Sequence, residues 1–222
     1  MIIGVDNLID YSTQPEKARS GITKVIIGDE NLTTVPSVIR LFPRLQQLYL
    51  SGNHIQSLPQ LSRLAVINLD NNNLTKLTPD IGMLTSLREL YLGFNQLTTL
   101  PVEMSNLTNL RILDLQSNSF SVIPSVIFPL SQLQSLNLMN NELTSDLSID
   151  GLSGLSILNV FNNHLTTYPV SFRHLSSLQR LYINRAVIRS IDNPVDALLV
   201  AYLSDDIIKT INSWACYSHQ KE

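Results

Sequence analysis

Residues 87–107 read LRELYLGFNQLTTLPVEMSNL, and the arrangement of leucines in this stretch decides the fold. The first eleven residues follow the pattern L-x-x-L-x-L-x-x-N-x-L. Leu90 and Leu92 alternate with Tyr91, so the leucines point to one side of an extended chain and the tyrosine to the other. The stretch therefore predicts a short strand with one buried face, followed closely by an asparagine, Asn95.

The same pattern recurs eight times along the chain. Its first apolar residue falls at Ile22, Leu45, Leu64, Leu87, Leu110, Leu133, Leu155 and Leu178, with spacings of 23, 19, 23, 23, 23, 22 and 23 residues. The ninth position is asparagine in six copies, namely Asn53, Asn72, Asn95, Asn118, Asn141 and Asn163. A period of this length is typical of stacked repeats, in which each unit buries its leucines against its neighbours.

The second half of most units carries an L-T-x-φ-P phrase, where φ is apolar, and then an apolar pair. Residues 97–101 are followed by Met104 and Leu107, and residues 165–169 by Phe172 and Leu175. With this ending the chain resembles intracellular, Ras-group-like leucine-rich repeat proteins and their bacterial relatives, over residues 22–191. The resemblance implies an α/β solenoid, a leucine-rich repeat horseshoe of eight repeats with a parallel concave sheet.

The asparagines are predicted to form a structural ladder inside the solenoid. After each strand the backbone turns sharply, which leaves inward N–H and C=O groups without partners in the sheet. An asparagine amide offers donors and an acceptor at short reach, so it can bridge the turns of adjacent repeats. The equivalent position is Glu30 in the first unit and Ala186 in the last, where a neighbour is missing on one side.

Two units and both ends depart from the pattern. The 45–63 unit is four residues short, so we expect a plain extended segment on its convex side. In the 133–154 unit Asp146 occupies an apolar position, and we expect Leu147 and Ile149 to substitute for it after a local shift. Residues 1–21 are the predicted N-terminal cap, with a short helix over 13–19 stopped by Gly21. Residues 192–222 are the predicted helical C-terminal cap and tail.

Composition limits the range of functions. The chain has 222 residues, of which 44% are hydrophobic, and its net charge of −3 gives no basic character that would favour nucleic acid. Apolar stretches are too short for a membrane span, and residues 1–5 lack a signal-peptide pattern. Extracellular members of the resembled family usually have cysteine-rich caps, whereas this chain has only Cys216. We therefore expect a cytoplasmic protein, or one delivered into a host cytosol if it is an effector.

Residues that could carry chemistry are scattered. The four histidines lack metal-ligand spacing, and Cys216 has His219 nearby without a site to activate the thiol. No glycine-rich phosphate loop is present. Glu89 and Asp114 are expected on adjacent strands, where exposed carboxylates commonly have no acid–base role. We accordingly predict no enzyme activity, no cofactor and no metal.

The concave face is the predicted binding surface. The third, fifth, seventh and eighth residues of each repeat should face outward, and they include side chains typical of binding hot spots. The predicted partner-binding residues are Tyr49, Tyr91 and Phe94 in the N-terminal half, Met139, Phe161 and Tyr182 in the C-terminal half beside Ile157, and Arg180 and Arg185. For any single tyrosine, ordinary β propensity is an equally good explanation.

These observations predict a monomeric protein–protein interaction module whose rigid scaffold loses little entropy on binding. Two alternatives remain open. One is a host-directed effector of an intracellular bacterium that acts by protein binding, and the other is a regulatory or inhibitor subunit of a separate enzyme. Late arginines, Arg173, Arg180, Arg185 and Arg189, could meet an acidic ligand, although a solvated edge balanced by nearby aspartates is the favoured interpretation.

Overall fold

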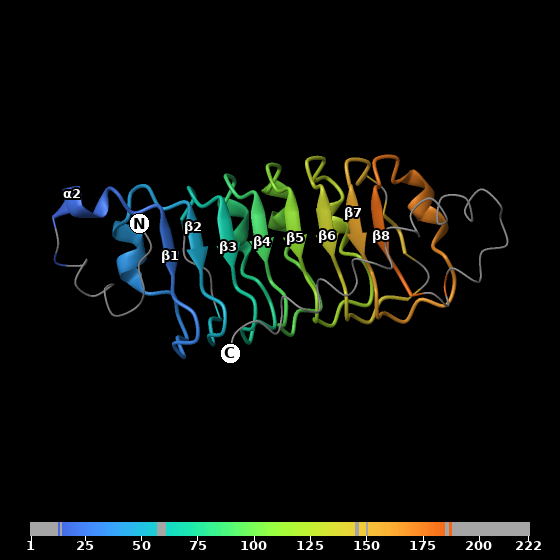
Figure 1. Ribbon diagram of the computed structural model, residues 1–222, viewed down its shortest axis with the longest axis horizontal. Helices are drawn as coiled ribbons and strands as arrows, with labels where there is room; N and C mark the ends of the chain where they lie inside the picture. The colour runs from blue at the N-terminus through green and yellow to red at the C-terminus, as the bar shows by residue number, and fades with distance from the viewer. Residues whose placement is uncertain are drawn as a thin grey trace.

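A computed structural model describes residues 13, 15–56, 61–144, 147–149, 151–184 and 187. Eight parallel strands form one sheet in the order in which they occur along the chain (Figure 1). Each strand is three residues long: β1 (Lys24–Ile26), β2 (Gln47–Tyr49), β3 (Val66–Asn68), β4 (Glu89–Tyr91), β5 (Ile112–Asp114), β6 (Ser135–Asn137), β7 (Ile157–Asn159) and β8 (Arg180–Tyr182).

Equivalent positions of consecutive repeats pair with one another in the sheet. Leu48 lies opposite Ile67, which lies opposite Leu90, and the shorter 45–63 unit does not shift this register. The third and fifth positions of all eight repeats consequently form continuous columns across the face opposite the core. This regular register is what turns a repeated sequence into a surface with predictable columns of side chains.

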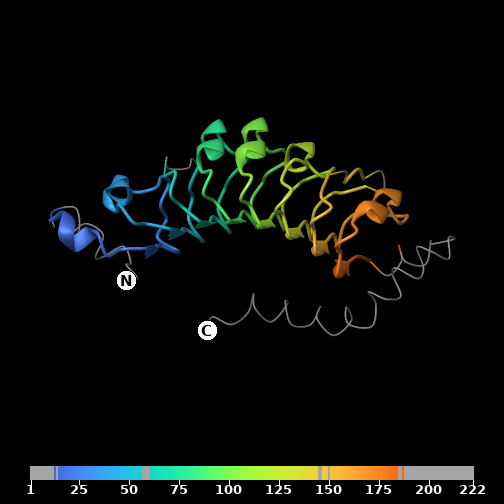
Figure 2. The same cartoon turned by 90° about the horizontal axis from the view of Figure 1, so that it is seen from above.

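Short 3₁₀ helices run along the side opposite the strands (Figure 2). Their bounds are η1 (Ser37–Leu41), η2 (Pro79–Met83), η3 (Val102–Asn106), η4 (Ser125–Ile127) and η5 (Val170–His174). Four of them follow a proline directly, and η2 begins with one. Proline fixes φ near a helical value, so it suits the start of such a turn. The bulkier helical side lies on the outside of the curve, and the strands line its concave side (Figure 2).

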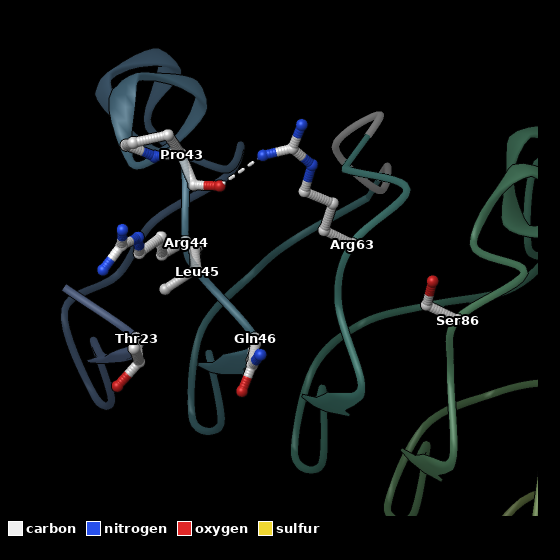
Figure 3. A pocket seen from close by; sticks show the side chains of 7 residues that line it. All are labelled: Thr23, Pro43, Arg44, Leu45, Gln46, Arg63 and Ser86. Carbon is white, nitrogen blue, oxygen red and sulfur yellow. Dashed lines mark hydrogen bonds between the residues drawn. The ribbon is translucent and has the colours of Figure 1, made fainter. Parts of the chain in front are cut away.

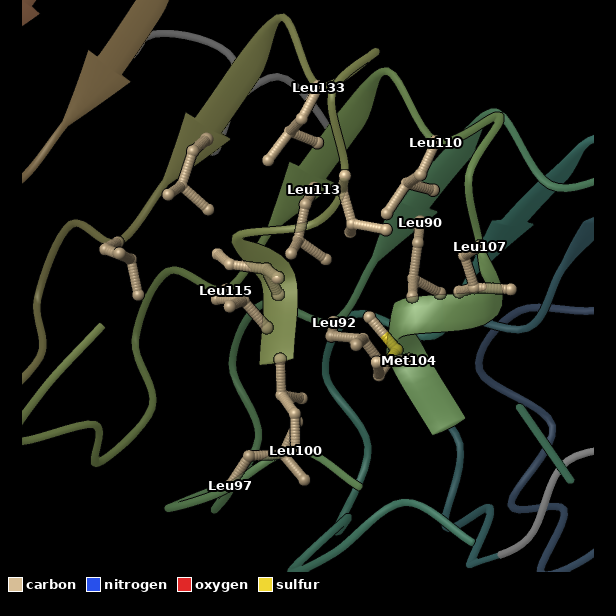
Figure 4. Packing of buried hydrophobic residues seen from close by; sticks show 14 of the residues in the cluster. Leu90, Leu92, Leu97, Leu100, Met104, Leu107, Leu110, Leu113, Leu115 and Leu133 are labelled. Carbon is tan, nitrogen blue, oxygen red and sulfur yellow. The ribbon is translucent and has the colours of Figure 1, made fainter. Parts of the chain in front are cut away.

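The core is a continuous stack of leucine layers (Figure 4). Within the fourth repeat Leu90 and Leu92 come from the strand side, whereas Met104 and Leu107 come from η3 and the residue after it, and all four are fully buried. Since each layer packs against the next repeat, no repeat has a core of its own.

The irregular 133–154 unit keeps its place in the core. Leu147 and Ile149 are both buried, which confirms that they fill the space left by the pattern break. The extended segment expected in the 45–63 unit includes residues 57–60, which lie outside the described residues.

Both predicted caps are described only in part or not at all. A short helix, α2 (Glu16–Arg19), falls within the span expected for the N-terminal cap, shortly before Gly21. The expected helical cap over 192–222 lies outside the described residues. Among the helices that are described, none has the length and apolar character needed to cross a bilayer.

Candidate functional site

The inner side of the turns after the strands is occupied by the asparagine ladder. The Oδ1 atom of Asn118 accepts the N–H of Leu97 at 2.9 Å, and its Nδ2 donates to the carbonyls of Leu92 and Leu115 at 2.9 and 3.1 Å. Leu92 and Leu97 belong to the preceding repeat, so one amide joins two turns. The other five asparagines repeat this arrangement, and all six are buried.

A second row of polar side chains lies on the concave face, at the fifth position. Each accepts the backbone N–H two residues later: Asn68 from Asp70, Asp114 from Gln116, Asn137 from Met139 and Asn159 from Phe161, at 2.9 to 3.1 Å. Sequence reasoning missed this row, although an Asn or Asp two residues before a turn is its signal. In the fourth repeat the fifth position is Tyr91, and the N–H of Gly93 donates instead to Asp70 Oδ1 at 2.7 Å.

The eighth position of the repeats has a left-handed backbone. Its members, Asp29, Gly52, Asn71, Phe94, Ser117, Asn140 and Asn162, have φ between 51° and 70°. Six of these N–H groups donate to the seventh-position carbonyl of the next repeat, as from Phe94 to Gln116 at 2.9 Å, and that of Asn162 donates to Asn184 Oδ1 at 2.7 Å, so the turn requires this geometry. Glycine, asparagine and aspartate tolerate it, but a bulky side chain rarely adopts it. Phe94 is therefore the strained member of the row.

The N-terminal aromatic residues lie on the concave face as accessible side chains. The Phe94 side chain is 42% exposed, and Tyr49 and Tyr91 are half-buried. The Nζ of Lys24 lies 4.4 Å from the centre of the Tyr49 ring, in a cation–π contact. The Tyr91 hydroxyl donates to Glu89 Oε2 at 3.0 Å.

The C-terminal residues of the predicted surface are less uniform. Met139 and Phe161 are half-buried, and Arg180 is exposed. Tyr182 is only 7% exposed although it lies outside the core cluster, so the expectation of an accessible ring was wrong. Strand alternation decides which face a side chain points to, but not how closely its neighbours cover it. Arg185 lies outside the described residues.

Glu89 and Asp114 are the carboxylate neighbours of Tyr91, and Asp70 lies close enough to Asp114 to feel its charge. Burial, followed by the nearby charge of Asp114, raises the pKa of Asp70 to about 7 against hydrogen bonds from Gly93 and Asn68. Asp114 is 7% exposed, and its burial raises the pKa of its carboxyl despite hydrogen bonds from Gln116 and Asn137. Burial, followed by the hydrogen bond to Glu89, raises the pKa of the Tyr91 hydroxyl. The middle of the concave face thus holds acidic groups whose burial, and in Asp70 also the charge of Asp114, favours their protonated forms.

A shallow pocket lies elsewhere, beside the turns that precede the first strands (Figure 3). It is lined by Thr23, Pro43, Arg44, Leu45, Gln46, Arg63 and Ser86, and Arg63 Nη1 donates to the Pro43 carbonyl at 2.6 Å. Within the described part of the chain, no three His, Cys, Asp or Glu side chains are grouped to hold a metal ion.

The leucine-rich repeat family model matches residues 62–120, 85–143 and 108–165, and a second model of the same repeat matches residues 44–64. The chain belongs to the leucine-rich repeat family. No curated protein matches its sequence. Leucine-rich repeat arrays commonly mediate protein–protein interactions and are generally non-catalytic scaffolds.

Solved structures of similar proteins come from bacteria and plants. A leucine-rich repeat protein of Leptospira interrogans is 27% identical, with a TM-score of 0.68, over 82% of this chain and 53% of that one. An internalin (inlF) from Listeria monocytogenes is 26% identical, with a TM-score of 0.52, over 72% of this chain and 54% of that one.

The third similar structure is the plant peptide hormone receptor RGFR1 in complex with RGF2. It is 30% identical, with a TM-score of 0.60, over 77% of this chain and 30% of the receptor. This repeat array therefore spans about half the length, or less, of each of these relatives.

Proposed function

We propose that this leucine-rich repeat protein is a non-catalytic binding module that holds a protein partner against its concave face. The observation that carries the proposal is Phe94, a 42% exposed phenylalanine with φ of 54°. Neither its exposure nor its backbone conformation favours a phenylalanine, and asparagine occupies the equivalent position at Asn71, Asn140 and Asn162. Strained residues of this kind cluster at functional sites.

The rigidity of the array supports the same function. Inter-repeat hydrogen bonds and a continuous core hold the strands, so the concave side chains are arranged before a partner arrives. A prearranged surface loses less conformational entropy on binding than a flexible one. Aromatic side chains on such a surface are typical of the residues that dominate binding energy.

Affinity capture with matched variants tests the proposal. The tagged protein, a Tyr49→Ala/Tyr91→Ala/Phe94→Ala variant and a convex-face control, Met83→Ala/Val102→Ala/Val170→Ala, are compared for the proteins that they retain from a cell lysate. The control removes three exposed apolar side chains from the opposite face. We expect the concave variant to lose a partner that the control retains. Retention of every partner by a folded concave variant would contradict the proposal.

The bacterial relatives favour a host-directed effector as a second candidate within the same binding role. Two of the similar solved structures are from Leptospira interrogans and Listeria monocytogenes. Parallel capture from bacterial and animal-cell lysates separates the two versions, since an effector should retain its partner only from the host lysate. If the retained partner is an enzyme, measuring its activity with and without the array tests the regulatory-subunit alternative.

A further inference from the structure

The contact between Lys24 and Tyr49 shows how a tyrosine of this sheet holds a cation. Lys24 is the third residue of its repeat, and Tyr49 is the fifth residue of the next one. The same geometric relation connects Val66 on β3 with Tyr91 on β4. Because valine has no charge, Tyr91 receives no equivalent cation from its neighbouring strand.

Two carboxylates, those of Glu89 and Asp114, act on the Tyr91 hydroxyl, and a third, that of Asp70, accepts the N–H of Gly93 two residues later. Their negative charge favours a cation at this position. Glu89 accepts the hydrogen bond from the Tyr91 hydroxyl. Asp70 belongs to the preceding repeat and Asp114 to the next one. In the described chain, the recorded donors to Asp70 and Asp114 are backbone N–H groups and amide side chains, all of them neutral. A cation supplied from outside would offset the charge of Asp114, which adds to burial in raising the pKa of Asp70.

Phe94 borders the same cluster from the turn after β4. Its N–H donates to the carbonyl of Gln116, whose side chain also packs near Gly93. A Cβ atom at Gly93 would lie 2.9 Å from Gln116 Cγ and 3.1 Å from Asp70 Oδ1, so glycine is needed for these side chains to close over the backbone. The exposed Phe94 side chain therefore follows Gly93, whose N–H donates to Asp70, on a turn whose backbone is held by a hydrogen bond.

From this geometry we propose that a central patch, formed by Asp70, Glu89, Tyr91, Phe94 and Asp114, binds a basic segment of a partner protein. An arginine or lysine of that segment lies over the Tyr91 ring, as Lys24 lies over Tyr49, and the carboxylates balance its charge. The inference rests on the proposed binding function and names the chemistry of the partner at that surface.

Three labelled octapeptides test the charge preference directly. Each alternates glycine with one other residue, which is arginine in the first, serine in the second and glutamate in the third. Fluorescence anisotropy at physiological ionic strength measures their dissociation constants with the full chain. We expect the arginine peptide to bind at least about tenfold more tightly than the serine peptide, and the glutamate peptide most weakly. Equal binding of the arginine and serine peptides would overturn the proposal.

Val66→Lys locates the binding position because it places a cation where Lys24 stands relative to Tyr49. We expect this variant to bind the arginine peptide about tenfold more weakly, since the new ammonium group lies over the Tyr91 ring and repels the ligand. Ile157→Lys is the matched control, with the same added charge at the third position of β7, two repeats beyond Asp114. If both variants weaken binding equally, the effect is general electrostatics and the proposed position is wrong.

A second pair of variants tests the carboxylates without changing their shape. The Asp70→Asn/Asp114→Asn variant should bind the arginine peptide more weakly by about tenfold or more, because the neutral amides no longer attract it. Asp80→Asn/Glu142→Gln removes the same charge from other surfaces, and we expect a change of less than about threefold. Thermal unfolding of each variant establishes that it is folded. Unchanged binding by the folded Asp70/Asp114 variant would contradict the assignment.

The two proposals can fail separately. Suppose that capture of a partner depends on Tyr49, Tyr91 and Phe94, but the arginine peptide binds no more tightly than the serine peptide. The proposed concave binding function would then be supported, and the proposal of a basic segment would be refuted. If the concave variant instead retains every captured partner, but the arginine peptide still binds at the central patch, then the patch binds cations without being the main protein interface. An acidic or apolar partner segment at the same patch would also refute the basic one.

Discussion

Asparagine forms two rows along this solenoid, and the rows differ in how strictly the residue is kept. The inner row has asparagine in six repeats, all of them buried between neighbouring turns. The outer row, at the fifth position, has asparagine only at Asn68, Asn137 and Asn159, and elsewhere has Ile26, Tyr49, Tyr91, Asp114 and Tyr182. Both rows bond backbone N–H groups, but every inner asparagine is buried, whereas the outer asparagines Asn68, Asn137 and Asn159 are only half-buried.

The contrast follows from what happens when the amide is removed. An inner amide bonds groups that have no other partner, so its loss leaves buried N–H and C=O groups unpaired. An outer side chain accepts an N–H that water can reach, or that a neighbour can take, as Asp70 takes the N–H of Gly93. The architecture therefore constrains the inner row, and the outer row is free to carry residues with a function.

The largest effect is expected from breaking the inner row. Asn118→Ala should lower the free energy of unfolding by about 1–3 kcal/mol, the cost of leaving buried polar groups unsatisfied. Asn137→Ala, its counterpart in the outer row, should lower it by less than about 1 kcal/mol, because water replaces the lost acceptor. Urea denaturation of both variants measures the difference. Equal losses would mean that the two rows are under the same constraint.

Asp70, which accepts the Gly93 N–H beside the outer row, should reveal its unfavourable burial through the pH dependence of stability. The pKa of Asp70 is raised from 3.8 to about 7 in the folded protein, so between these pH values the native state binds a proton that the unfolded state has released. The free energy of unfolding contributed by this group therefore falls as the pH rises through that window.

Asp70→Asn removes this titration while keeping an acceptor for the Gly93 N–H. We expect the melting temperature of the variant to be close to that of the parent protein near pH 4. At pH 8 it should be higher, and the difference should develop between these two pH values. Differential scanning calorimetry across this range measures it, and Asp80→Asn serves as the control. A gap that stays constant with pH would show that Asp70 titrates normally.

The smallest effect concerns the eighth position, where function and stability should oppose each other. Phe94→Asn should raise the free energy of unfolding by up to about 1 kcal/mol, since asparagine tolerates the left-handed backbone better than phenylalanine. The reverse change at the equivalent site, Asn71→Phe, should lower it by a similar amount. The two melting temperatures, measured against the parent, check the signs. If Phe94→Asn instead lowers the free energy of unfolding, then Phe94 stabilises the fold by packing, and its backbone strain is no evidence for a binding role.

Much of the fold could be predicted because its determinants are local and repeated. The alternation of Leu90, Tyr91 and Leu92 predicts a strand and its buried face, and recurrence predicts the stack. The parallel sheet of eight strands confirms this interpretation. The prediction that Leu147 and Ile149 replace an expected core residue is also confirmed, because a stacked core leaves space only for apolar side chains.

The binding surface could be predicted less completely. The columns of outward positions followed from the period, and they include Phe94 and Tyr91. Asp70 was overlooked, because its importance depends on the distance to Asp114 two repeats away and on the missing side chain at Gly93. The exposure of Tyr182 was misjudged for a related reason, since coverage by neighbours is not periodic.

By itself the sequence determined the repeat, the inner ladder and the direction in which each strand residue points, because these depend on spacing within one unit and on the chemistry of one side chain. Only the tertiary structure decided which outward residues are accessible and which carboxylates oppose one another. Accessibility and electrostatic repulsion depend on distances between repeats in three dimensions. Those distances arise from the register and curvature of the whole stack, which no single repeat contains.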